Sequence, residues 1–102
     1  MSNSTRMWAR NELYVDVCLL EDGSLQFAGQ DLKTFGKDEY EYALTVAPGD
    51  ISKVSAALGG KPGDDVIALL AANAERIIQT GELAWLRSIG IEPGFWSRIS
   101  MD

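Results

Sequence analysis

Residues 39–47, with the sequence EYEYALTVA, show a clear alternation of polar and apolar side chains. Successive side chains of a β-strand point to opposite faces, so this period of two predicts a strand with one buried face. The apolar face carries every second residue from Tyr40 to Val46, and the opposite face carries Glu39 and Glu41. The tyrosines are therefore expected to pack in a core rather than to stack on bases.

Two further strands are expected before this one. Apolar side chains alternate with other residues over positions 12–20, and the alternation resumes over 24–31. Between these runs, Asp22-Gly23 supplies the positive φ angle that a tight hairpin turn requires. The pattern predicts a hairpin of 12–20 with 24–31. A loop over 31–38 then leads into the strand at 39–47, which completes an antiparallel meander.

Helical spacing replaces strand alternation after Pro48-Gly49-Asp50, where proline interrupts strand pairing and Asp50 can cap a helix. Apolar residues three and four apart predict helices over about 51–58, 66–80 and 82–89, separated by glycine-containing turns. The tail from Ile91 contains a Pro-Gly turn. It is expected either to add an edge strand or to lie over the helices, with Phe95 or Trp96 as an anchor.

This order of elements predicts an α+β fold. It consists of an antiparallel β-meander of three strands, or four if the tail joins, followed by three helices packed on one face. A chain of 102 residues has room for one core, so residues 1–102 are expected to form a single domain. Residues 1–10 show no periodicity, and we expect a flexible arm that docks through Trp8.

The composition argues against several classes of function. The chain has no histidine, which removes the commonest general base at neutral pH and most zinc sites. Its single cysteine, Cys18, has no basic neighbour in sequence and is expected to be an inert thiol. No apolar run is long enough to span a bilayer, and the first residues lack the apolar segment of a secretory signal. We therefore expect a cytoplasmic protein that is not an enzyme and has no cofactor.

Acidic residues dominate the first two thirds of the chain. The net charge is −6, and residues 12–65 hold eleven acidic residues against four lysines. This balance disfavours nucleic acid and anionic membranes, and it favours a basic protein partner. Two acidic groups, with Trp96 as an exposed aromatic anchor, form the candidate partner-binding set: Asp38, Glu39, Glu41, Asp64, Asp65 and Trp96.

The same acidic residues have two other interpretations. They can be a solvated strand face and a helix start, where the helix dipole favours negative charge. They can also form a carboxylate site for a divalent cation, but such a site needs several convergent oxygens and the spacing does not supply them. The sequence therefore predicts no metal site.

Several blocks of this chain occur together and in the same order in a group of small bacterial proteins of uncharacterised function, which it resembles over about residues 12–97. These blocks are GQDL at 29–32, EYEY at 39–42, ALGG at 57–60 and PGDDV at 62–66, followed by Trp85-Leu86 and Gly90-Ile91. This resemblance implies no catalytic residue.

In its size, its acidity and its lack of histidine, the chain is also similar to the immunity proteins of contact-dependent growth inhibition and related toxin systems. Those proteins bind a cognate toxin domain, often a basic nuclease. The resemblance implies an immunity protein that neutralises a toxin by charge and shape complementarity. The alternative is a structural or regulatory homo-oligomer, such as a homodimer, in which an exposed strand edge or the tail pairs with a second copy.

Overall fold

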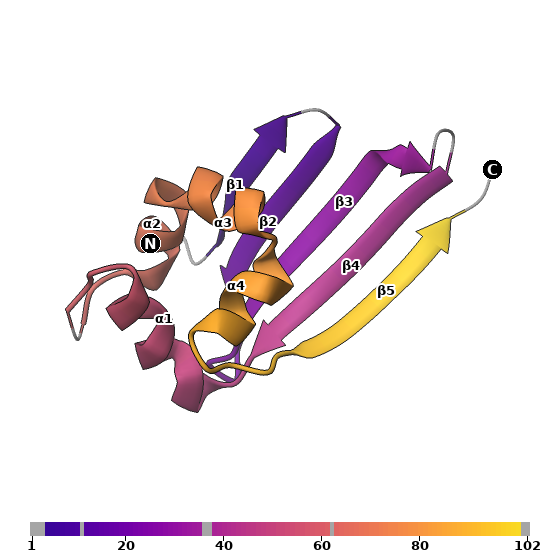
Figure 1. The fold of residues 1–102 in the computed structure, drawn as a ribbon. Coiled ribbons are helices and arrows are strands. Elements are labelled where there is room, and N and C mark those ends of the chain that lie inside the picture. The colour runs from indigo at the N-terminus through magenta and orange to yellow at the C-terminus, as the bar shows by residue number, and fades with distance from the viewer. Residues whose placement is uncertain (1–3, 11, 36–37, 62, 101–102) are drawn as a thin grey trace.

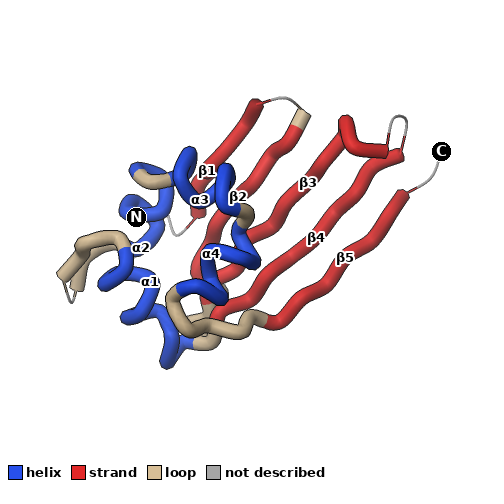
Figure 2. The backbone as a smooth tube through the Cα atoms, in the orientation of Figure 1, coloured by secondary structure: helices blue, strands red, loops and turns tan. Residues whose placement is uncertain are grey.

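The computed structural model describes residues 4–10, 12–35, 38–61 and 63–100. For residues 33–35, 38, 99 and 100 it describes the backbone alone. Five strands form one antiparallel sheet in chain order (Figures 1 and 2). They are β1 (Ser4–Arg10), β2 (Leu13–Leu19), β3 (Leu25–Phe35), β4 (Asp38–Val46) and β5 (Gly94–Ser100). The predicted α+β meander is confirmed, and the tail is an edge strand.

The helices lie between β4 and β5 in the chain and cover one face of the sheet (Figure 1). A short 3-10 helix, Pro48–Asp50, leads into α1 (Ile51–Ala57), and α2 (Val66–Ala72), α3 (Ala74–Thr80) and α4 (Glu82–Ser88) follow. None of the described helices is long and apolar enough to cross a membrane. We call the covered face of the sheet the inner face and the opposite face the outer face.

The core forms where the inner face of the central strands meets the helices. The alternation that predicted the strands also fills this core, because every second residue of β2, β3 and β4 points toward the helix layer. Strand and helix side chains less than 2% exposed are Val15, Val17, Leu25, Phe27, Leu44, Val46, Val54, Leu70, Ile77 and Leu86. Trp85 of α4 is buried as well.

The prediction of a flexible N-terminal arm is wrong, because residues 4–10 form β1 and pair with β2. The register shifts between Arg6 and Trp8, which marks a β-bulge or similar irregularity. Met7 is buried and the neighbouring Trp8 also packs against the core. Two adjacent apolar residues break the alternation that identifies a strand, and the irregularity is what accommodates both.

Two other boundaries differ from the prediction. β3 continues to Phe35, so much of the expected loop at 31–38 is strand. The long helix predicted over 66–80 is divided at Asn73, whose side-chain amide donates to the carbonyl of Leu69 at 2.8 Å. Side-chain bonds of this kind compete with the helical hydrogen-bond pattern. The result is two short helices, α2 and α3, in place of one.

Candidate protein-binding surfaces

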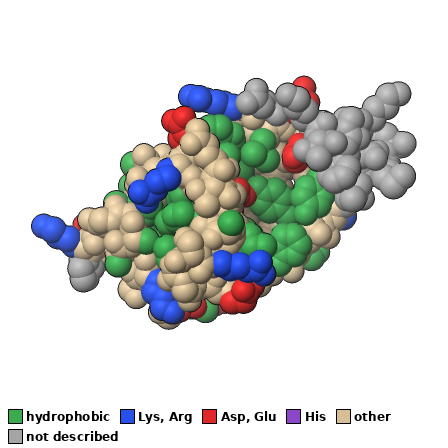
Figure 3. Space-filling view, viewed as in Figure 1, with side chains coloured by type: hydrophobic (Ala, Val, Ile, Leu, Met, Phe, Trp, Pro, Cys, Tyr) green, Lys and Arg blue, Asp and Glu red, His purple; other side chains and the backbone are tan. Residues whose placement is uncertain are grey.

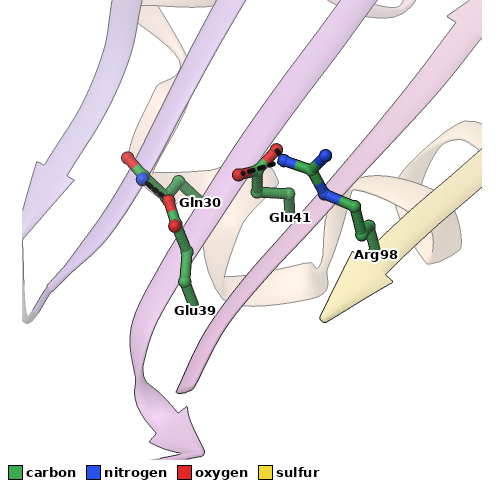
Figure 4. Close-up of polar contacts among 4 residues, drawn as sticks. All are labelled: Gln30, Glu39, Glu41 and Arg98. Carbon is green, nitrogen blue, oxygen red and sulfur yellow. Dashed lines mark hydrogen bonds and ion pairs between the residues drawn. The ribbon is translucent and has the colours of Figure 1, made fainter. Parts of the chain in front are cut away.

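The predicted residues Glu39, Glu41 and Trp96 share the outer face of the sheet, on β4 and β5. Nη2 of Arg98 donates to both carboxylate oxygens of Glu41, at 3.1 and 3.2 Å, and the side-chain amide of Gln30 donates to Glu39 (Figure 4). These contacts offset the charge of Glu41 and occupy an oxygen of Glu39. The outer face is therefore less acidic than the sequence of β4 indicates.

Trp96 projects from the outer face of the edge strand. It pairs with Ala43 of β4, which in turn pairs with Ala28 of β3, so the residues beside the indole in the sheet have short side chains. The indole is 51% exposed, and the guanidinium carbon of Arg98 lies 5.9 Å from the ring centroid. Trp96 is thus a large apolar surface available to another molecule.

Asp64 and Asp65 lie away from these residues. Figure 1 shows the α1–α2 connection and the start of β4 at opposite ends of the molecule. Oδ1 of Asp65 accepts from the amides of Ile67 and Ala68 and caps α2, and Oδ2 of Asp64 accepts from the amide of Lys61 at 2.7 Å. Asp38 begins β4, but its side chain lies outside the described residues. The two predicted acidic groups do not form one patch.

A hollow of about 1320 Å³ opens between α1, the β2–β3 turn and the residues that lead into α2. We call it the end groove. Much of its lining is apolar and includes Leu19, Leu20, Ile51 and Val66. Leu20 is 37% exposed, so part of this apolar surface is open to solvent.

Charged side chains also line the end groove. The carboxylates are Glu21, Asp64 and Asp65, and the cations are Lys53 and Lys61. Lys53 forms an ion pair with Asp50 at 3.1 Å, which offsets its charge. The sequence predicted Asp64 and Asp65 as binding residues but did not indicate Glu21 or the groove. The groove forms only where three separate segments of the chain meet. The only local hint was the pair of acids beside Gly23.

A partly buried polar contact joins the sheet to the helix layer. The hydroxyl of Tyr42, on the inner face of β4, donates to the carboxylate of Glu82 in the first turn of α4. Burial, followed by the negative charge of Glu82, raises the pKa of the Tyr42 hydroxyl far above its ordinary value. The Tyr42 ring lies against Gly29 of β3, where any Cβ would overlap it. Tyr42 packs on the core side as predicted, but Glu82 was not anticipated.

Within the described part of the chain, no group of three or more histidine, cysteine or acidic side chains is placed to hold a metal ion. Cys18 is half-buried, and its thiol lies 3.9 Å from the side-chain oxygen of Gln26. Comparisons with protein-family models, curated proteins and solved structures give no match. Charge, shape and exposed apolar surface are therefore the basis for a functional proposal.

Proposed function

We propose that this protein is an immunity-type inhibitor that binds a basic toxin domain, and that the end groove is its main docking surface. The observation that carries the proposal is an open, largely apolar hollow whose lining includes the carboxylates of Glu21, Asp64 and Asp65. Protein interfaces commonly join an apolar centre to a polar rim. A basic partner would place an apolar side chain in the hollow and cations near the rim.

The overall charge supports the same kind of partner. The chain carries −6, and the excess of acids is concentrated in residues 12–65, which include the β2–β3 turn and both sides of the end groove. A field of this sign speeds encounter with a basic protein and repels nucleic acid. The protein itself needs no catalytic group for this role, since it acts by covering a surface of the toxin.

The structure changes which residues we assign to this binding. Glu41 already pairs with Arg98, and Glu39 with Gln30, so both have less to offer a cationic partner. Asp65 caps the start of α2, whereas Asp64 accepts from the Lys61 amide in the turn before that helix through one oxygen, Oδ2, and Glu21 lies on the exposed β2–β3 turn. We therefore assign the larger electrostatic role to Glu21 and Asp64, and the apolar contact to Leu20.

The proposal is tested by purifying the protein with the product of a toxin gene that adjoins its own, measuring affinity by calorimetry and the association rate by stopped-flow fluorescence. Leu20→Asp should weaken binding more than tenfold, because it places a charge in the apolar centre. Glu21→Lys should mainly slow association, by up to about tenfold at low salt. Glu75→Lys, which makes the same charge change on the exposed side of α3, is the matched control. Failure of the wild type to bind, or equal losses from Glu21→Lys and Glu75→Lys, would sink the proposal.

A further inference from the structure

The strand β5 ends the sheet on one side. It is hydrogen-bonded to β4, while its other edge has no neighbour among the described strands. α2 and α3 pack against β1 at the opposite end of the sheet, and the main contacts of β5 are with β4. Figure 1 shows β5 lying clear of the helix layer along most of its length. The free edge of β5 therefore has room for another strand.

β5 also lacks the features that usually prevent an edge strand from pairing with another chain. Edge strands commonly carry lysines, prolines or bulges for this purpose. β5 has the sequence GFWSRIS and stays in regular register with β4 from Gly94 to Ser100. Its one charge, Arg98, is directed to Glu41. Both faces expose a large apolar side chain, with Phe95 56% exposed on the inner face and Trp96 51% exposed on the outer face.

We propose that β5 pairs antiparallel with β5 of a second copy, across a two-fold axis that passes through Ser97 perpendicular to the sheet. A two-fold axis makes the interface self-complementary, with each residue of one strand opposite a fixed residue of the other. In this register Trp96 lies opposite Arg98 of the second copy on the outer face, where guanidinium and indole attract each other. Position 95 lies opposite position 99 on the inner face.

Neighbouring registers are poorer. An axis at Arg98 sets two guanidinium groups directly opposite each other, and like charges in that position are destabilising. An axis at Trp96 pairs only residues 94–98 and leaves the last two residues of the strand without partners. The axis at Ser97 uses the whole of β5, residues 94–100. Like any two-fold axis perpendicular to the sheet, it keeps both helix layers on the same side of one continuous sheet, each away from the junction.

The dimer is tested first by its mass. Light scattering over a wide concentration range should show the wild type rise from 11.1 kDa toward twice that value. Trp96→Lys places a cation opposite Arg98 of the second copy, so this variant should remain a monomer. Ala9→Lys puts the same side chain on the outer face of the other edge strand and should behave as the wild type. A wild type that stays monomeric throughout overturns the proposal.

The register is tested by cross-linking. Directly opposite Cα atoms of an antiparallel pair lie about 4.5–5.5 Å apart, which is within the range of disulfides. Ser97→Cys, in a Cys18→Ser background, should therefore form a covalent dimer on mild oxidation. Ala9→Cys in the same background is the control and should not. A dimer that Ser97→Cys fails to cross-link has another interface and contradicts the assignment. The result does not depend on whether the end groove binds a toxin.

Discussion

One row of residues crosses the inner face of the sheet from β2 to β5, in the order Val17, Phe27, Leu44 and Phe95. The first three are at most 1% exposed, but Phe95 is 56% exposed. All four are apolar and point to the same side, so residue type does not explain the difference. It arises because the helices cover this row as far as β4 and leave its β5 end open, and Figure 3 shows apolar surface uncovered beside the helix layer.

The two ends of the sheet differ in the same way. At β1 an irregularity in the strand pairing brings Met7 and Trp8 to the core, and α2 and α3 pack against the strand. At β5 the pairing is regular and two aromatic side chains face solvent. At the β1 end the edge strand is packed against helices, whereas at the other end β5 has the features of an edge strand that can pair with a further strand. The core and the exposed aromatic surface thus belong to different parts of one sheet.

The largest expected effect separates the two phenylalanines of that row. Phe27→Ala should lower the free energy of unfolding by about 3–5 kcal/mol, because it opens a cavity in a fully buried site. Phe95→Ala should cost the monomer less than about 1 kcal/mol, since the side chain is already largely in water. Chemical denaturation at low protein concentration measures both. Similar losses in the two variants would show that β5 belongs to the core after all.

The next largest loss of stability is expected where the part of the sheet covered by helices meets the uncovered part, at Gly29 and Tyr42. Gly29→Ala forces a Cβ into the Tyr42 ring and displaces its hydroxyl from Glu82, so overpacking and a lost hydrogen bond together should cost about 2–4 kcal/mol. Gly49→Ala is the control, because a Cβ there meets no atom within 4 Å. A shift in the urea midpoint for Gly29→Ala no larger than for Gly49→Ala would contradict this packing.

The Tyr42 to Glu82 bond should appear in the pH dependence of stability. Tyr42→Phe should cost about 1.5 kcal/mol at neutral pH, as is usual for a hydrogen bond to a charged group. The pKa of Tyr42 is raised in the folded state, so its contribution is complete below the ordinary tyrosine pKa of about 10 and is lost as the pH rises above it. The wild type should therefore lose stability faster than Tyr42→Phe in alkali. Tyr14→Phe removes a tyrosine hydroxyl on the outer face, away from Glu82, and is the matched control.

The smallest effect concerns the ion pairs of the outer face. Arg98 and Glu41 lie at the β5 end, with side chains 59% and 29% exposed, and Arg6 and Asp16 lie at the β1 end. Double-mutant cycles should give about 0.2–1 kcal/mol of coupling for each pair, weaker in high salt. A coupling energy well above that range for Arg98 and Glu41 alone would show that this pair stabilises the β5 end of the sheet more than an ordinary exposed ion pair does.

The features that the sequence predicted correctly depend on short-range patterns. Strands β2 to β4 and the helix positions follow from periodicities of two and about 3.6, which a window of ten residues reveals. β1 was missed because adjacent Met7 and Trp8 break the alternation at the point where the register shifts. The division at Asn73 was missed because it depends on one side-chain hydrogen bond.

The candidate site was harder to predict, because its contacts join distant parts of the chain. Glu41 and Arg98 are 57 positions apart, and Tyr42 and Glu82 are 40 positions apart. The sequence identified Trp96 as a possible exposed anchor and Asp64 and Asp65 as an acidic group. It could not indicate that Glu41 would be paired, or that Glu21 would join the two aspartates at one groove. Only the fold brings these residues together.

The contrast between the two edges is tested most directly by amide hydrogen exchange, followed residue by residue in dilute and concentrated samples. Pairing of β5 with a second copy should slow exchange of its outward-facing amides as concentration rises, while β1 amides keep their rates. The account is contradicted if β5 exchanges equally fast at every concentration, or if protection increases at β1 instead.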